Sequence, residues 1–304
     1  MALKNFLEFV EIRTKVASFI PFLLGAVFSL YRYGSFNWKN FHLMLVSLLS
    51  IDMATTAINN YIDYKKTNAA VTYQMDENTA KRIIILLLSA AVTFGLLLFI
   101  NTDIVVLILG AVSFTVGVFY TYGPLPISRM PLGEVFSGFF MGFVIIFLSV
   151  YINALDQKLV QVFLDRAVLS VNLKIAEIIY IFLFSIPAVN GIANIMLANN
   201  ICDMENDAKN RRYTLPVYLG KERALKLFKY LYLIIYLDLL LVIALKIVPV
   251  YTAATLITAL PVHKNIEKFA INTEKNRTFV LAVRNFIMIN VAYMSTILLG
   301  LIWP

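Results

Sequence analysis

Residues 174–207 read KIAEIIYIFLFSIPAVNGIANIMLANNICDMEND, an apolar stretch that ends in amides and carboxylates. A helix needs about 20 apolar residues to cross the roughly 30 Å hydrocarbon core of a bilayer. Residues 174–200 meet that length, and the polar residues follow at once. This stretch predicts a transmembrane helix with a charged end that is capable of chemistry.

Eight further apolar stretches accompany it. In chain order the nine run over 15–33, 42–63, 83–100, 104–120, 134–154, 174–200, 225–246, 247–262 and 282–302. The fourth and the eighth are short for a span, so the count is good to about one. The sequence therefore predicts an all-α integral membrane protein of about nine transmembrane helices. The whole chain, residues 1–304, is expected to form one integral-membrane domain.

The composition excludes an ordinary soluble protein. The chain is 60% hydrophobic and 14% charged, against about 25% charged residues in an average soluble domain, and its mean hydropathy is +0.79. Lipid must solvate so much apolar surface. The lone cysteine, Cys202, excludes an intramolecular disulfide. The N-terminal residues lack a small-residue cleavage pattern and are expected to be a retained amphipathic lead-in.

The basic residues are distributed unevenly between the two faces of the membrane. If the N-terminus is cytoplasmic, 20 of the 26 Lys and Arg residues fall on the inside and 6 on the outside. This predicts a multi-pass protein of the cell membrane with a cytoplasmic N-terminus and cytoplasmic polar loops. The net charge of +8 is then mainly the positive-inside excess, although attraction of an anionic substrate or lipid is the alternative. On the other face, residues 155–173 look like an amphipathic surface segment.

Two polar columns stand at the inner ends of apolar stretches. Asp52, Thr56, Asn59 and Asp63 are spaced i, i+4, i+7 and i+11, which places them on one stripe of a helix with Asn60 beside it. The spacing of the second column is i, i+4 and i+8, and its members are Asn199, Asp203 and Asp207. Four stretches separate the columns, so both face the same side. The matching Asn-Asn-x-x-Asp patterns are consistent with an internal duplication.

Polar residues at a helix end can be ordinary interfacial residues. Two matching columns argue against that reading, because buried carboxylates cost on the order of several kcal/mol unless they are paired. Oxygen ligands without His or Cys suit a hard cation, and Mg²⁺ is the usual choice when a phosphate completes the shell. Lys66, Lys209 and Arg212 follow the columns and could reach a diphosphate, although each also serves as a positive-inside anchor. The pattern favours an intramembrane enzyme acting on a metal-bound diphosphate.

A third polar stretch, residues 120–134, reads YTYGPLPISRMPLGE. Its prolines and glycines predict a rigid, non-helical connector. A flat anionic acceptor could be held by Tyr120, Tyr122 and Arg129. The alternative is that the connector is only a turn between spans.

These three segments together resemble the UbiA superfamily of intramembrane aromatic prenyltransferases. The family patterns are Asn-Asp-x-x-Asp and Asp-x-x-x-Asp, and residues 59–68 (NNYIDYKKTN) and 199–220 (NNICDMENDAKNRRYTLPVYLG) correspond to them. The connector and the opening RTKVASFIPFLLG (13–25) look like the branch that prenylates dihydroxynaphthoate on the route to menaquinone. The resemblance covers essentially the whole chain and implies a UbiA-type helical bundle.

The resemblance also implies a mechanism, electrophilic aromatic substitution. A polyprenyl diphosphate ionises on Mg²⁺, and the ring of the aromatic acceptor attacks the allylic cation and loses carbon dioxide. The implied metal ligands are Asn59, Asp63, Asp203 and Asp207, and the implied cofactor-binding residues are Asn59, Asn60, Lys66 and Asn199. The implied catalytic set comprises Asp63, Asp203, Asp207, Lys209, Arg212, Tyr120, Tyr122 and Arg129. The expected partners are these two substrates and the bilayer, with no nucleic acid and no obligate protein.

One departure from the family pattern stands at Asn60, where the family has its first Asp. Asp52, Asp76 and Glu77 are the acids that could compensate. The alternatives are a superfamily member with another acceptor, such as hydroxybenzoate, haem or homogentisate, a transporter with intramembrane carboxylates, and a non-catalytic paralogue. Transporters usually bind near the midplane at broken helices, whereas these acids stand at span ends.

Overall fold

The computed structural model describes residues 2–67, 76–121, 127–166 and 168–303, without the side chains of residues 2, 63–67, 120, 121, 128 and 164. Its α-helices are α1 (Ala2–Phe9), α2 (Val16–Tyr33), α3 (Trp38–Thr67), α4 (Glu77–Asn101), α5 (Ile104–Thr121), α6 (Gly133–Ser137), α7 (Ile145–Asn153), α8 (Ile175–Lys209), α9 (Leu215–Leu219), α10 (Lys221–Ala244), α11 (Ala259–Ile271) and α12 (Phe279–Ile302). The 3-10 helices are η1 (Ile12–Lys15), η2 (Ile127–Arg129), η4 (Leu155–Gln157) and η5 (Val250–Thr258), and η3 (Gly138–Val144) is a π-helix. The strands are β1 (Val160–Asp165) and β2 (Val168–Leu173).

The helical membrane architecture is confirmed. Seven helical segments within the described ranges have the length and composition of a membrane span, namely Ile12–Tyr33, Trp38–Ile62, Glu77–Asn101, Gly133–Asn153, Ile175–Lys209, Lys221–Ala244 and Phe279–Ile302. The other two predicted stretches are helical but short: one is α5, and the other falls on the η5–α11 pair. The chain is a multi-pass membrane protein, and the expected count of nine includes these two short members.

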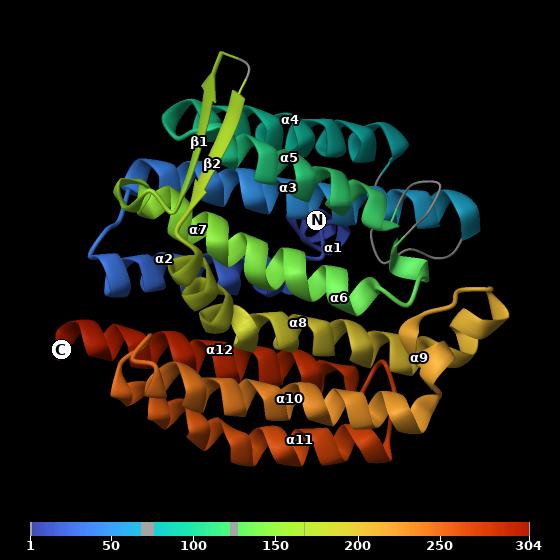
Figure 1. Cartoon of the computed structure of the whole chain (residues 1–304). Coiled ribbons are helices and arrows are strands. Elements are labelled where there is room, and N and C mark those ends of the chain that lie inside the picture. Colours follow the sequence, from blue (N-terminus) through green and yellow to red (C-terminus); the bar gives the residue numbers. More distant parts are fainter. Residues whose placement is uncertain (1, 68–75, 122–126, 167, 304) are drawn as a thin grey trace.

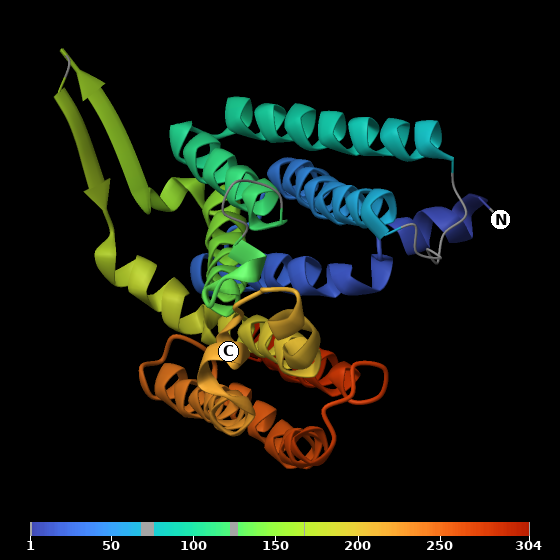
Figure 2. The same cartoon turned by 90° about the vertical axis from the view of Figure 1, so that its right-hand side faces the viewer.

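The helices form one bundle whose two halves meet along α6–η3–α7 and α8 and through the contact of α2 with α12. Helices α2 to α5 lie on one side, and α10 to α12 lie on the other (Figures 1 and 2). Helix α8 contacts α10, α12 and η3, and α2 contacts α7. The far ends of α3 and α8 lie at the same end of the bundle, on the right in Figure 1. This end, called here the acidic end, brings the two predicted polar columns to one side of the membrane.

Glycines allow the central helices to approach closely. A Cβ built on Gly142 would lie 2.5 Å from the Cα of Val189, and one on Gly138 would lie 2.8 Å from the carbonyl oxygen of that residue. Both glycines belong to η3, a π-helical segment that packs on α8. Small residues at such contacts are typical of membrane bundles, because van der Waals packing must supply the attraction that water would otherwise drive.

The departure from an all-α fold is a β-hairpin between α7 and α8. Strands β1 and β2 pair antiparallel from Val160–Leu173 to Asp165–Val168. The sequence predicted an amphipathic surface segment here without its secondary structure. The alternating, β-branched sequences VQVFLD and VLSVNL explain the strands, because such residues suit a pleated, half-buried surface.

The η3–α8 contact predicts that Gly142→Ala lowers stability. The added methyl group meets backbone atoms of Val189, which no side-chain rotation can move aside, so the helices must separate. The expected loss is about 1–3 kcal/mol, typical of overpacking. Thermal unfolding in detergent, followed by circular dichroism, measures it. Gly110→Ala is the matched control, since a Cβ there meets nothing within 4 Å; an equal loss in both variants would contradict the packing argument.

Candidate functional site

The second polar column lies at the end of α8, where its carboxylates have defined partners. Asp207 is only 6% exposed, and its Oδ2 accepts a hydrogen bond of 3.2 Å from the hydroxyl of Thr214. The backbone N–H of Arg212 donates to the carbonyl oxygen of Asp207 at 2.8 Å, and the guanidinium lies 4.0 Å from its Oδ1. The turn that follows α8 therefore folds back and fixes this carboxylate.

The neighbouring carboxylate, Asp203, forms an ion pair with Lys275. Lys275 belongs to a tight turn between α11 and α12, in which Thr278 donates both its backbone N–H and its hydroxyl to the carbonyl oxygen of Glu274. Lys275 was not among the predicted site residues, because in the sequence it fits the positive-inside pattern. Its partner is 72 residues away in sequence, and no local pattern links the two.

The connector lies against the same column. The backbone N–H of Tyr213 donates to the carbonyl oxygen of Arg129 at 3.1 Å, while the side chain of Arg129 is exposed. Asn200 donates to Oε1 of Glu134 at 2.8 Å, and Glu134 is only 3% exposed. Two of the three predicted segments are thus joined. Glu134 was not among the predicted site residues, although it closes the connector motif.

For the remaining predicted site residues the structure describes fewer contacts or only the backbone. Asn199 is partly buried on α8, and Lys209 is exposed at its last turn. Asp63 and Lys66 lie in the last turns of α3 and Tyr120 lies in α5, but their side chains are outside the described set. Tyr122 falls outside the described residues altogether.

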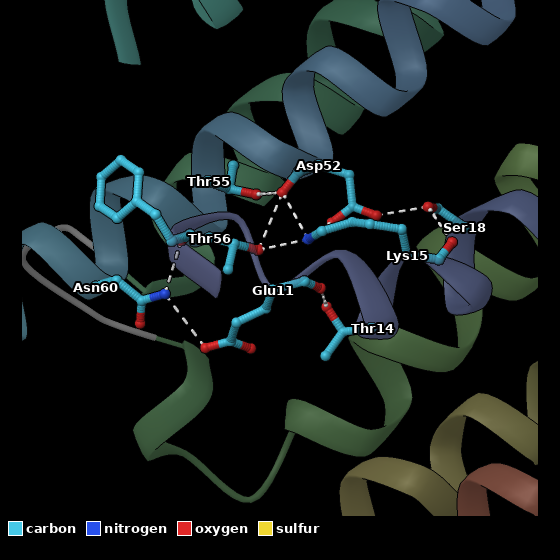
Figure 3. A network of polar contacts seen from close by, with 9 residues as sticks. Glu11, Thr14, Lys15, Ser18, Asp52, Thr55, Thr56 and Asn60 are labelled. Atoms are coloured by element: carbon cyan, nitrogen blue, oxygen red, sulfur yellow. Dashed lines mark hydrogen bonds and ion pairs between the residues drawn. The ribbon is translucent and has the colours of Figure 1, made fainter. Parts of the chain in front are cut away.

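The first polar column has an outer part, at Asn59 and the neighbouring Asn60, and a deeper part around Asp52. The amide of Asn60 donates to the carbonyl oxygen of Phe9 at 2.9 Å and to Oε1 of Glu11 at 3.2 Å, which fastens the N-terminal segment to α3 (Figure 3). Asn59, by contrast, lines a cavity. The residue that departs from the family pattern therefore has a structural contact of its own.

A buried ion pair occupies the deeper part of that column. The ammonium of Lys15 donates to Oδ1 of Asp52 at 2.8 Å and to the hydroxyl of Thr56 at 2.6 Å, and Ser18 donates to Oδ2 at 2.5 Å (Figure 3). The side chains of the pair are 5% and 16% exposed. Lys15 already neutralises Asp52, so this acid does not stand free to replace the one missing at position 60.

The two other candidate replacements are also engaged. Asp76 caps the N-terminus of α4 by accepting from the backbone N–H of Thr79 at 2.9 Å. Glu77 pairs with Lys81 at 2.7 Å and accepts from the hydroxyl of Tyr61 at 2.8 Å.

A cavity of about 610 Å³ lies beside the first column. Its walls come from α3, α4, α5 and the α6–η3–α7 segment, and they are mostly apolar. Small residues such as Gly95 and Gly110 make room on α4 and α5, while Asp52, Thr55 and Asn59 give the α3 wall its polar side chains. The cavity thus runs along a polar stripe that leads to the acidic end.

The acidic end offers oxygen donors to a metal. Within the part of the chain whose side chains are described, no three His, Cys, Asp or Glu residues form a ready metal-binding group. The donors there include the amide of Asn199 and the carboxylates of Asp203 and Asp207, which also pair with Lys275 and with Thr214 and which a bound cation would have to share with these partners. Oxygen donors of this kind fit a hard cation that takes its remaining ligands from a phosphate.

Comparison with known proteins decides the family. The model of the UbiA prenyltransferase family matches residues 18–290. The chain belongs to this family. It is also 31% identical over 224 residues to the 1,4-dihydroxy-2-naphthoate octaprenyltransferase of Bacillus subtilis. The match covers 70% of this chain and 65% of that enzyme, slightly less than two thirds of its length.

Solved structures of the family share the fold. A UbiA homologue from Aeropyrum pernix superposes with a TM-score of 0.68 at 17% identity, covering 93% of this chain and 98% of that one. A digeranylgeranylglyceryl phosphate synthase gives 0.62 at 15% identity, covering 98% of both chains. A UbiA homologue from Archaeoglobus fulgidus, solved with DMAPP and Mg²⁺, gives 0.57 at 14% identity, covering 96% and 99%. At these identities the likeness establishes the architecture.

The buried ion pair predicts a strong and repairable loss of stability. Lys15→Met removes the partner of a buried carboxylate, which is expected to cost about 3–5 kcal/mol. Replacing both members, in Lys15→Met/Asp52→Leu, should recover most of this loss, because no buried charge remains. Thermal unfolding of the two variants in detergent measures the difference.

The control is Lys4→Met, which removes an exposed pair with Glu8 at 3.8 Å and should cost at most about 1 kcal/mol. A double variant less stable than Lys15→Met would refute the charge argument.

Proposed function

We propose that this chain transfers a polyprenyl group from polyprenyl diphosphate to 1,4-dihydroxy-2-naphthoate, with loss of carbon dioxide, giving demethylmenaquinone. The observation that carries the proposal is the apolar cavity that runs along the polar stripe of α3 toward the acidic end. A substrate with a long apolar tail and a charged head needs this combination. The identity to the naphthoate octaprenyltransferase of Bacillus subtilis supports the choice of acceptor.

In this proposal the donor lies with its tail in the cavity and its diphosphate at the acidic end. Asp203 and Asp207, with Asn59, Asp63 and Asn199, are proposed to hold Mg²⁺. The ion, when bound, neutralises the oxygens of the leaving diphosphate. The positive charges proposed to bind the diphosphate come from Lys66, Lys209, Arg212 and Lys275. Asn60 is proposed to act indirectly, by fastening the N-terminal segment.

The chemistry breaks the bond between the allylic carbon and the diphosphate oxygen, and the bonding electrons leave with the diphosphate. The ring carbon that carries the carboxylate attacks the cation, and carbon dioxide departs to restore aromaticity. The apolar walls of the cavity keep water from capturing the cation first. Tyr120 and Tyr122 are proposed to shield the cation, and Arg129 to pair with the acceptor's carboxylate.

The proposal also fixes an orientation. The N-terminus and the acidic end face the cytoplasm and the protein resides in the cell membrane, since this arrangement puts most basic residues inside. The chain acts as one domain. The soluble acceptor then arrives from the cytoplasm and the donor from the bilayer.

The direct test is an assay of the purified protein with 1,4-dihydroxy-2-naphthoate, octaprenyl diphosphate and Mg²⁺. Prenylated product and one carbon dioxide per turnover are expected, with little product from 4-hydroxybenzoate. Chelation of Mg²⁺ should stop turnover. Product from 4-hydroxybenzoate alone would refute the acceptor assignment. Asp203→Asn should lose turnover while keeping its melting temperature, and full activity in that variant would contradict the proposed metal site.

The ion pair at Asp203 predicts two opposite effects of Lys275→Gln. Binding of the prenyl diphosphate should weaken about three- to tenfold, a modest loss because a half-exposed ammonium is screened by water. Binding of Mn²⁺ without substrate, followed by electron paramagnetic resonance, should tighten, because Asp203 no longer has a competing cation.

The matched control is Lys268→Gln, an exposed lysine of α11 that should change neither affinity. If Lys275→Gln also changes neither, Lys275 has no role in binding.

A further inference from the structure

The β1–β2 hairpin has an apolar face and a largely polar face. Successive side chains of a strand point to opposite faces, so the cross-strand pairs Val160–Leu173 and Val162–Val171 share one face. The pairs Gln161–Asn172, Phe163–Ser170 and Asp165–Val168 share the other, on which the two apolar residues, Phe163 and Val168, are 48% and 63% exposed. Leu169 continues the apolar face and is 65% exposed, while Val171 and Leu173 are half exposed.

The hairpin is held firmly at its base. The hydroxyl of Tyr151 lies 2.5 Å from Oδ2 of Asp103 and 3.1 Å from the carbonyl oxygen of Val160. The backbone N–H of Lys174 closes the base by donating to the carbonyl oxygen of Leu159 at 2.9 Å. From this base the strands run across the helix axes and stand clear of the bundle (Figures 1 and 2). A hairpin that crosses the helix axes extends along the plane of a membrane that those helices span, and this one lies at the end opposite the acidic end.

On the β1 side of the apolar face Val160 and Val162 pack against the core, while the β2 side of the same face stays exposed. Strand β1 contacts α5, where Ile104 and Ile108 are exposed on a helix within the bundle's outer wall. A two-stranded hairpin also has two open edges, whose backbone N–H and C=O groups cannot be satisfied inside hydrocarbon. These two facts together fit the headgroup layer, where one face can touch acyl chains while the edges reach water.

The charges at the turns complement an anionic headgroup layer. Lys158 precedes β1, Arg166 stands at the tip and Lys174 follows β2, and all three are exposed. Lys158 and Arg166 form no ion pair within the described part of the chain. Each basic residue near an anionic membrane surface adds to attraction. The acids Asp156 and Asp165 lie nearby and offset part of this charge.

We propose that the β1–β2 hairpin is an interfacial anchor. It lies in the headgroup layer of the leaflet opposite the acidic end, with the face of Leu169, Val171 and Leu173 toward the acyl chains and its basic residues on anionic lipid phosphates. Amphipathic elements that lie in the interface bind by this combination of apolar area and charge. The anchor is separate from the prenyl-transfer site and does not depend on the proposed function.

The test uses the alternation of the two faces. Single cysteines at positions 169, 170, 171, 172 and 173, in a Cys202→Ser background, are spin-labelled in nanodiscs that contain phosphatidylglycerol. Collision with oxygen should exceed collision with a water-soluble nickel chelate at 169, 171 and 173, and the order should reverse at 170 and 172. Ile108→Cys provides the lipid reference and Asn210→Cys the aqueous reference.

A second arm tests the charges. Replacing phosphatidylglycerol with a zwitterionic lipid should shift the labels at 169, 171 and 173 toward the aqueous reference. Lys158→Gln/Arg166→Gln should remove this lipid dependence, and Lys246→Gln, on the same side but outside the hairpin, should keep it. Nickel access at all five positions would overturn the anchor in favour of a hairpin in water. Protection from both probes with spin–spin broadening would overturn it in favour of a contact between two copies.

Discussion

The constraint on which the structure depends is that a hydrocarbon core offers no water to a polar group, so burying one there is costly unless a neighbour inside the protein pairs with it. The pair of Lys15 and Asp52 obeys it, and the bond from Asn200 satisfies Oε1 of Glu134. At the other end of the bundle Arg32 of α2 donates to Glu177 of α8 at 2.7 Å. These contacts join helices that are far apart in sequence, and they fix which faces of α2, α3, α6 and α8 turn inward.

The sequence predicted the helices well, because span length is a local property. The nine apolar stretches all became helical segments, and the two short ones were already recognisable from their length. The spacing along α8 predicted that Asn199, Asp203 and Asp207 would share the acidic end. The β-hairpin was predicted only as an amphipathic surface segment, since its periodicity does not decide between strand and helix over so short a length.

The site was predicted less completely, because its partners are set by packing between distant segments. No sequence pattern near Lys275 indicates that it pairs with Asp203. Asp52 fitted the stripe of candidate ligands, yet its carboxylate already pairs with Lys15, 37 residues earlier in the chain. Asn60 fitted the motif, and it serves the N-terminal segment. Spacing identifies the face on which a side chain stands, whereas its neighbours depend on the opposing helix.

Different helices supply the polar groups of the cavity wall and the space inside the cavity. The carboxylate of Asp52 and the amide of Asn59 stand on α3, while small residues such as Gly95 and Gly110 make room on α4 and α5. A side chain added at Gly110 meets no neighbour within 4 Å. At that position selection can fill part of the apolar space with a methyl group without disturbing the charged end. In the proposed function, such separation would make the length of the bound hydrocarbon an evolvable trait, independent of the chemistry that releases its head.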